Sequence, residues 1–142
     1  MPSLMWEFDA IARCATQYRT EMLAPIGLKS CHASYLLNIC ADPGISQEQL
    51  ARRIYFNKSS VARQLAALEE DGFIRRVTCE NDRRIIRLYP TDKTLEILPR
   101  IRQVLLDWEQ LATQDLTAEE QEIIRILLNK MKARASSQVQ PD

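Results

Sequence analysis

The pattern of hydrophobic and polar positions is most regular between residues 44 and 93, where it predicts two short helices followed by a β-hairpin. The first helix begins with Ser46 and Gln49, which have the spacing of a capping box. Past the second helix, the helical spacing gives way to two runs rich in β-branched and aromatic residues, 73–79 and 85–89. Helix, turn, helix and hairpin in this order predict a winged helix-turn-helix.

The second of these helices, residues 57–71, has a polar face made mostly of small residues. Its apolar stripe is Val61, Leu65 and Leu68, and Gly72 follows as the residue best able to adopt the left-handed conformation at a helix end. An ordinary solvated helix carries long charged side chains opposite its apolar stripe. Here small residues surround the side chains of Arg63 and Gln64, which can hydrogen-bond to base edges, as a helix entering the major groove of DNA needs. The predicted reading face consists of Ser60, Arg63, Gln64 and Ala67.

The turn of the predicted hairpin carries charged residues that suit a second contact with DNA. Arg83 and Arg84 lie at or near its tip, where a guanidinium can enter a narrow minor groove. Asp82 is close enough in sequence to pair with one of them and set its direction. Lys58, at the start of the second helix, is expected either to contact a phosphate or to lie on a solvated face.

These residues together resemble the MarR family of winged-helix transcription regulators, and the resemblance extends over most of the chain. Residues 57–63 are similar to the family's recognition-helix opening, 68–74 to its helix end, and 82–84 to its D-x-R wing signature. The resemblance implies that Arg84 enters the minor groove and that Asp82 orients it. It also implies that four residues face the major groove, namely Ser59, Ser60, Arg63 and Gln64.

The distribution of charge agrees with this interpretation, although the net charge of the 142 residues is zero. Residues 44–90 carry nine Lys or Arg against six Asp or Glu, a balance of +3. The balance is −1 for residues 1–43 and −2 for residues 91–142. Positive charge is therefore concentrated where the predicted fold would touch phosphates. We expect modest non-specific affinity for DNA and a strong dependence of binding on salt.

Segments on both sides of the DNA-binding region 44–90 are predicted to be helical and to form a dimerisation region, 1–43 and 91–135. Apolar residues in the first helix recur at a heptad-like spacing, which suits packing against another helix. This seam covers either a second subunit or the chain's own core. Its members are Leu4, Phe8, Ile11, Ala15, Tyr18 and Met22.

A second long helix is predicted from 92 to 114, with Pro99 inside it. Because proline removes a backbone hydrogen bond, it predicts a kink near residues 95–99 or a later start of the helix. The last helix opens at Thr117 with another capping box, and 136–142 is predicted to be a flexible tail. The expected fold class is mainly α with a small β-hairpin: a winged helix-turn-helix plus N- and C-terminal dimerisation helices within one compact chain.

The family resemblance also implies control by small molecules, often phenolic or otherwise aromatic, held between the dimer helices and the DNA-binding region. Met22, His32 and Tyr35 are candidates to line such a pocket. The alternative is that each is an ordinary core residue, because a single His on a partly apolar helix is usually a satisfied structural group. His32 stands where the family often has Gln.

Four scattered cysteines and a single His make a structural zinc site a poor interpretation, so we expect no metal and no cofactor. Cys79, beside the wing, is the more exposed candidate for a thiol-based redox sensor, because arginines near it would favour the thiolate. Buried, inert thiols are expected at Cys14, Cys31 and Cys40. The sequence shows no signal peptide and no apolar run long enough to span a membrane, which predicts a cytoplasmic protein with reduced thiols.

The sequence thus predicts a homodimeric regulator that binds a palindromic operator in double-stranded DNA. Repression, with release by a small aromatic ligand, is implied by the resemblance alone. Two alternatives remain: a thiol-based redox-sensing regulator, and a winged helix used as a protein-interaction module, which would tend to have an apolar reading face. An enzyme is not expected, since no nucleophile with a nearby base, H-E-x-x-H motif or phosphate-binding loop is visible.

Overall fold

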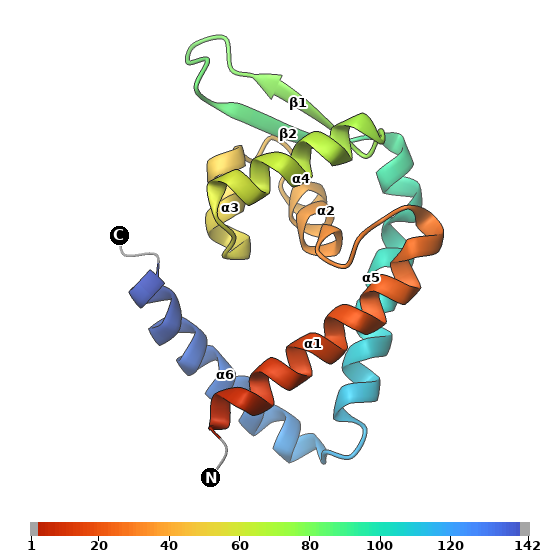
Figure 1. Cartoon of the computed structure of the whole chain (residues 1–142), viewed down its shortest axis with the longest axis vertical. Helices are drawn as coiled ribbons and strands as arrows, with labels where there is room; N and C mark the ends of the chain where they lie inside the picture. Colours follow the sequence, from red (N-terminus) through yellow and green to blue (C-terminus); the bar gives the residue numbers. More distant parts are fainter. Residues whose placement is uncertain (1–2, 140–142) are drawn as a thin grey trace. The chain divides into compact units, whose positions relative to one another are not determined.

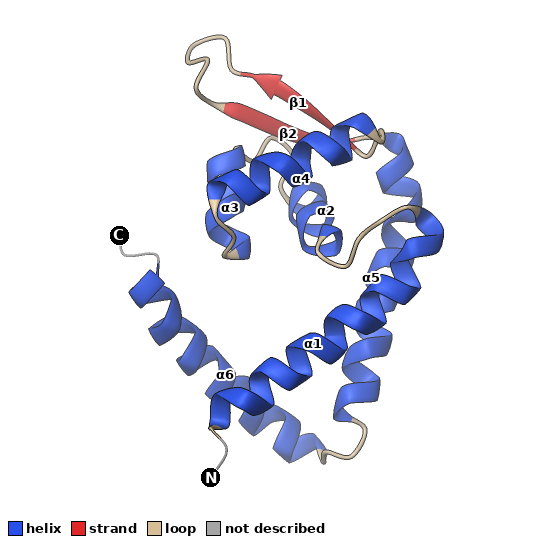
Figure 2. Cartoon of the chain, in the orientation of Figure 1, coloured by secondary structure: helices blue, strands red, loops and turns tan. Residues whose placement is uncertain are grey.

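The computed structural model describes residues 3–139 and separates into two compact units, one ending at Leu106 and one beginning at Asp107. Each unit is described by itself, and Figure 1 labels the elements. The first unit contains α1 (Leu4–Leu23), the 3-10 helix η1 (Ala24–Ile26), α2 (His32–Ala41), α3 (Gln47–Ile54), α4 (Lys58–Glu70), the strands β1 (Ile74–Thr78) and β2 (Ile86–Pro90), and most of α5 (Asp92–Thr113). The second contains the end of α5 and α6 (Ala118–Val139). The mainly helical fold with one hairpin is confirmed, as the colours of Figure 2 make clear.

Local sequence signals explain where the helices of the helix-turn-helix begin and end. Ser46 Oγ accepts a hydrogen bond from the Gln49 backbone N–H, and Gln49 Oε1 accepts one from the Ser46 N–H, both at 3.1 Å, so the predicted capping box is confirmed. Asn57 caps α4 by accepting from the Ser60 N–H at 2.8 Å. Gly72 follows α4 with a φ of +82°, the left-handed conformation predicted for it.

The wing is an antiparallel hairpin held to the helix-turn-helix by a third short segment. Strand β1 pairs with β2 in a register that places Arg76 opposite Leu88. On its other side β2 meets the residues that lead into α3: the Leu88 N–H donates to the Ile45 carbonyl at 2.9 Å, and the Gly44 N–H donates to the Leu88 carbonyl at 2.7 Å. The base of the wing is therefore hydrogen-bonded to the start of the helix-turn-helix.

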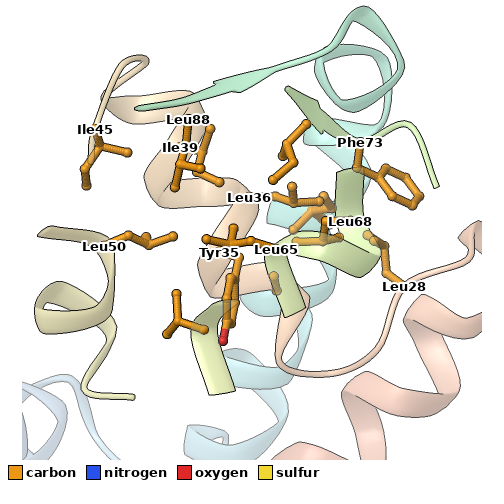
Figure 3. Close-up of a cluster of buried hydrophobic side chains, with 14 of the residues drawn as sticks. Leu28, Tyr35, Leu36, Ile39, Ile45, Leu50, Leu65, Leu68, Phe73 and Leu88 are labelled. Atoms are coloured by element: carbon orange, nitrogen blue, oxygen red, sulfur yellow. The ribbon is translucent and has the colours of Figure 1, made fainter. Parts of the chain in front are cut away.

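The core of the first unit gathers the apolar stripes that the sequence pattern predicts. Figure 3 shows side chains from α2, α3 and α4 pointing toward one another around Tyr35 and Leu65. Val61, Leu65 and Leu68, the predicted stripe of α4, are at most 1% exposed. The stripe is thus buried as predicted, and the opposite face of α4 is left to solvent.

Helix α5 begins at Asp92 and continues through Pro99 to Thr113, so the predicted later start is wrong. Its first turn is anchored to the end of α4 and the start of the wing. The fully buried Thr94 hydroxyl donates to the Phe73 carbonyl at 2.6 Å, and the Thr91 hydroxyl donates to the Gly72 carbonyl at 2.6 Å. These bonds hold the start of the helix in place, and Pro99 then removes only a single donor from its interior.

The second unit is dominated by α6, in which none of the described residues is buried. Its start is the predicted capping box, with the Glu120 N–H donating to Thr117 Oγ1 at 3.1 Å and the Thr117 N–H donating to Glu120 Oε1 at 3.0 Å. The helix continues to Val139, past residue 136, where the sequence predicts a tail to begin; 140–142 lie outside the described residues. Large apolar side chains of α6 are exposed, namely Ile123, Ile124, Ile126, Leu127, Leu128 and Met131.

Helix α1 also buries little of its apolar surface. Ala15 is buried, and Tyr18 and Met22 pack partly against the core, so this end of the predicted seam faces the chain's own interior. At the other end Leu4 is 64% exposed and Ile11 is 56% exposed. The seam is therefore divided between core contact and open surface. Among the described residues, no helix is both long enough and apolar enough to pass through a lipid bilayer.

Candidate nucleic-acid interface

The outward face of α4 carries most of the side chains predicted to meet DNA. Lys58, Ser59 and Arg63 are exposed, and Ser60 is half-buried beside them. Arg63 Nη2 donates to Ser60 Oγ at 3.4 Å, a long contact that leaves most of the guanidinium donors available. Lys58 Nζ lies 3.3 Å from Glu48 Oε1, and both side chains are more than half exposed. Because exposed ion pairs contribute little free energy, Lys58 can exchange Glu48 for a phosphate at small cost.

Gln64 does not lie opposite the apolar stripe, and this corrects the prediction from the sequence. Its side chain is half-buried, and its Oε1 lies 2.8 Å from Nε2 of His32 at the start of α2. On a helix, position 64 falls between the buried stripe and the exposed face, next to Leu65 and one turn after Ser60. Gln64 therefore lies at the edge of the reading face, with its carbonyl oxygen directed to the protein.

At the wing tip, Arg84 is held by hydrogen bonds to Asp82. Arg84 Nε and Nη2 each donate to Asp82, at 3.0 Å to Oδ1 and 3.0 Å to Oδ2, and the Arg84 backbone N–H also donates to Oδ1. The side-chain hydrogen bonds from Arg84 hold the pKa of Asp82 below its ordinary value, and Asp82 in turn raises the pKa of Arg84. The Arg84 side chain is nevertheless 90% exposed. Arg83 beside it is exposed as well.

A cleft of about 220 Å³ lies between the wing and the start of α3, and the sequence did not reveal it. It brings Arg84 together with Lys58, two cations that the primary structure separates by a whole helix and a strand. The Gln47 Oε1 is buried without a hydrogen-bond partner. The juxtaposition depends on the pairing of β2 with the segment before α3, which is a tertiary contact. The cleft is lined by Ser46, Gln47, Glu48, Lys58, Arg84, Ile85 and Ile86.

Glu69 joins the end of α4 to the wing. Its Oε2 accepts from the Arg76 backbone N–H at 2.8 Å, while its Oε1 accepts from Arg76 Nε at 3.1 Å and Nη2 at 3.0 Å. The backbone hydrogen bond from Arg76, followed by the bond and charge of its side chain, lowers the pKa of Glu69. The wing and α4 are thus connected by the bidentate Arg76–Glu69 pair, in which both side chains are partly shielded from water.

The three residues predicted to line a ligand pocket lie in or against the core of the first unit. His32 is 4% exposed and Tyr35 is 1% exposed, and Met22 packs against the same core, so the alternative of ordinary core residues describes them better. A cavity of about 380 Å³ lies nearby between α1, α2 and the turn before α4, and none of the three lines it. Its lining residues are Thr16, Arg19, Ser30, Cys31, Ala33, Ser34, Leu37, Asn38, Phe56 and Leu105.

Arg19 is the charged residue of this cavity. Its Nε is buried without a hydrogen-bond partner, and burial lowers the pKa of the guanidinium. A buried donor without a partner is costly, which makes it a position where an acceptor from outside the chain would be stabilised. No periodic pattern in the sequence singles out Arg19, since it lies beside the apolar seam of α1.

All four cysteines are free, and they differ in exposure from the prediction. Cys14 is exposed, and Cys31 and Cys40 are half-buried, with burial raising the pKa of the latter two thiols. The backbone N–H groups of Asp82 and Asn81 lower the pKa of the Cys79 thiol, with a smaller contribution from Arg87. Redox sensing by Cys79 stays a prediction.

Comparison with known proteins identifies this arrangement. Residues 31–86 match the model of the MarR family. Over 132 residues the chain is 30% identical to YybA, an HTH-type transcriptional regulator of Bacillus subtilis, covering 93% of this chain and 88% of that protein. The crystal structure of MarR superposes with a TM-score of 0.86 at 31% identity, covering 96% and 93% of the two chains. A MarR family regulator from Listeria monocytogenes complexed with 26mer DNA shares the fold, with a TM-score of 0.90 at 23% identity over 97% and 92%. The chain therefore belongs to the MarR family of winged helix-turn-helix transcriptional regulators, which are not enzymes.

Proposed function

We propose that this regulator binds a palindromic operator in double-stranded DNA as a homodimer, with α4 in the major groove and the wing in the minor groove. The observation that carries the proposal is the Arg84–Asp82 fork, in which two side-chain hydrogen bonds hold a guanidinium that is 90% exposed. An exposed ion pair adds little to stability, so the fork is best explained as a device that aims a guanidinium at a partner. The relative complexed with 26mer DNA supports the choice of that partner.

The helices outside residues 44–90 supply the dimerisation region in this proposal, 1–43 and 91–135. Both α1 and α6 leave large apolar side chains open, among them Trp6 at 68% and Leu127 at 50% exposure. Extensive apolar surface on a monomer usually marks an interaction site. Two copies of α4 held about one helical turn of DNA (~34 Å) apart would read the two halves of a palindrome. Repression follows from the family resemblance, since a dimer on its operator blocks access to the promoter.

Substitution of the two arginines tests the proposed contacts separately. Arg63→Ala is expected to weaken operator binding by about 1–3 kcal/mol and to relax base preference in the major groove. Arg84→Ala is expected to weaken binding mainly where the wing meets A·T-rich DNA, because the narrow minor groove there attracts a guanidinium. Binding is measured by fluorescence anisotropy at two salt concentrations, using labelled DNA from upstream of the protein's own gene and scrambled DNA as competitor.

Arg100→Ala is a matched control, since it removes an exposed arginine from α5, outside the proposed interface. It should leave affinity close to that of the wild type. If Arg63→Ala and Arg84→Ala also keep wild-type affinity and base preference, the reading face has been misplaced. Weak binding that is equal for both DNAs would favour the protein-interaction module instead.

For the ligand that releases the regulator, we propose the cavity at Arg19 in place of Met22, His32 and Tyr35. Its volume of about 380 Å³ suits a ligand with one aromatic ring. Leu37, Phe56 and Leu105 supply apolar contacts, and the unpartnered Arg19 Nε supplies a donor for an acidic group. The ligand class that fits is a small aromatic carboxylate.

Arg19→Gln is expected to weaken binding of 2-hydroxybenzoate by roughly 10-fold or more, because a charge-assisted hydrogen bond contributes about 1.5–3 kcal/mol. Isothermal titration calorimetry measures the dissociation constant. Arg13→Gln, an exposed arginine on the same helix, is the control and should not change it. Equal affinity of wild-type protein and Arg19→Gln would place the ligand elsewhere.

A further inference from the structure

His32, the first residue of α2, makes hydrogen bonds on opposite sides of its ring, one to the loop before α2 and one to Gln64 of α4. The Lys29 backbone N–H donates to Nδ1 at 3.0 Å, and Nε2 lies 2.8 Å from Gln64 Oε1. The Tyr35 ring lies edge-on to the imidazole, with centroids 6.3 Å apart. With 4% of its surface exposed, the ring is held by the protein on every side.

The backbone bond from Lys29 determines which ring nitrogen carries the proton. A backbone N–H can only donate, so Nδ1 must be an unprotonated acceptor. In a neutral imidazole the proton is then on Nε2, which donates to Gln64. Burial, with a smaller contribution from Lys29, lowers the pKa of His32 below its ordinary value, while the hydrogen bond to Gln64 and the charge of Asp71 oppose this shift. The ring is therefore neutral at neutral pH. Gln64 must therefore turn its carbonyl oxygen, and not its NH2 group, toward the ring.

This orientation limits what Gln64 can offer to a base. A free Gln reads adenine through a pair of bonds, accepting from N6–H and donating to N7. Here the carbonyl oxygen is directed to His32, and Gln64 is half-buried, so the Nε2 end of the amide lies on the side away from the ring. The outward part of the side chain is then an NH2 donor. Its partners in the major groove are acceptors: O6 and N7 of guanine or O4 of thymine.

We propose that His32 is a specificity-determining residue that acts through Gln64, orienting its amide so that α4 offers a donor, and not a donor–acceptor pair, to one base. This proposal rests on the DNA binding proposed above. His32 touches no base itself and is a positioning residue. The sequence signal for it was the His at a position where the family often has Gln, a residue that can also accept from one neighbour and donate to another.

Selection from a library of randomised duplex DNA tests the role, with wild-type protein, Gln64→Ala, His32→Phe and His32→Gln compared at one pH and salt. Gln64→Ala identifies the base pair that Gln64 reads, because preference is lost there. Wild-type protein is expected to select guanine or thymine at that base. His32→Phe releases the carbonyl oxygen, so adenine should gain roughly fivefold or more at this base relative to wild type, with other positions unchanged.

His32→Gln is the rescue variant, since its amide can accept from the Lys29 N–H and donate to Gln64, and it should keep the wild-type preference. A merely structural role for His32 would lower affinity for all sequences alike and leave the preference unchanged. Selection of adenine by wild-type protein, or an unchanged preference in folded His32→Phe, would overturn the proposal. So would a Gln64→Ala variant that retains preference at every base.

A spectroscopic measurement on the unmodified protein keeps the proposal testable if His32→Phe does not fold. The chain contains a single His, so the ¹⁵N resonances of labelled histidine report this ring alone. Protonation at Nε2 is expected at neutral pH, and a proton on Nδ1 would contradict the geometry. If wild-type protein selects no sequence while the Nε2–H form is present, the proposed DNA binding fails and the specificity role falls with it, whereas the hydrogen bond itself stands.

Discussion

Replacement of Leu127 in α6 by glutamate is expected to dissociate the dimer and to weaken operator binding by about 10²–10⁴-fold. In the single chain Leu127 is 50% exposed, and none of the described residues of α6 is buried. If a second subunit covers this helix, a carboxylate placed there must be desolvated without a partner, which is strongly unfavourable. A monomer would then hold only one half of the palindrome, and the gain from simultaneous binding of both halves would be lost.

Light scattering coupled to size-exclusion chromatography gives the mass in solution, and fluorescence anisotropy gives the affinity for the full operator. Asn129→Glu introduces the same charge at an exposed polar position of α6 and serves as the matched control. Neither substitution removes a buried group, so both variants should keep their helical content. A Leu127→Glu protein that remains a dimer would show that α6 lies outside the interface.

Leu65→Ala is expected to lower the free energy of unfolding by about 2–5 kcal/mol, the range found when a buried leucine is truncated and a cavity remains. Leu65 is 0% exposed and lies in the middle of the core cluster with Tyr35 and Leu68 (Figure 3). Its side chain points away from the proposed DNA interface. DNA affinity per folded molecule should therefore change far less than stability.

Urea unfolding monitored by circular dichroism measures this loss, at one fixed protein concentration because the stability of a dimer depends on it. Ala66→Ser changes the neighbouring exposed position on α4 and should alter stability by less than about 0.5 kcal/mol. A loss below about 1 kcal/mol in Leu65→Ala would mean that the core relaxes to fill the cavity more completely than is usual.

Much of the proposed interface could be predicted because its signals are local. Asp82 and Arg84 are two residues apart, so their pairing needs only a turn. The capping boxes at Ser46 and Thr117 each join residues three apart in sequence. Such contacts form within one turn of chain and depend little on the rest of the fold. For this reason the Asp82–Arg84 pair and both capping boxes form as the sequence predicts.

Where the structure differs from the sequence analysis or adds to it, the surroundings of the residue depend on another element. Gln64 was placed on the reading face by its helical position, but the His32 ring from α2 decides where its amide points. The sequence did not reveal Arg19 because its cavity is assembled from α1, α2, the turn before α4 and α5. In α5 the proline predicted either a kink near residues 95–99 or a later start. The later start is wrong, because hydrogen bonds from Thr91 and Thr94 to the preceding residues hold the first turn.

By itself the sequence determined the order of helices and strands, the buried stripe of α4 and the charged wing tip, because short-range spacing and side-chain chemistry are enough to specify them. Tertiary structure alone decided which cations share the cleft beside the wing, that Nε of Arg19 is buried without a hydrogen-bond partner, and which end of the Gln64 amide faces His32. These features join residues tens of positions apart in sequence, and a periodic pattern does not indicate which of such residues come into contact. Packing brings them together, and the desolvation of their polar groups then determines which hydrogen bonds must form.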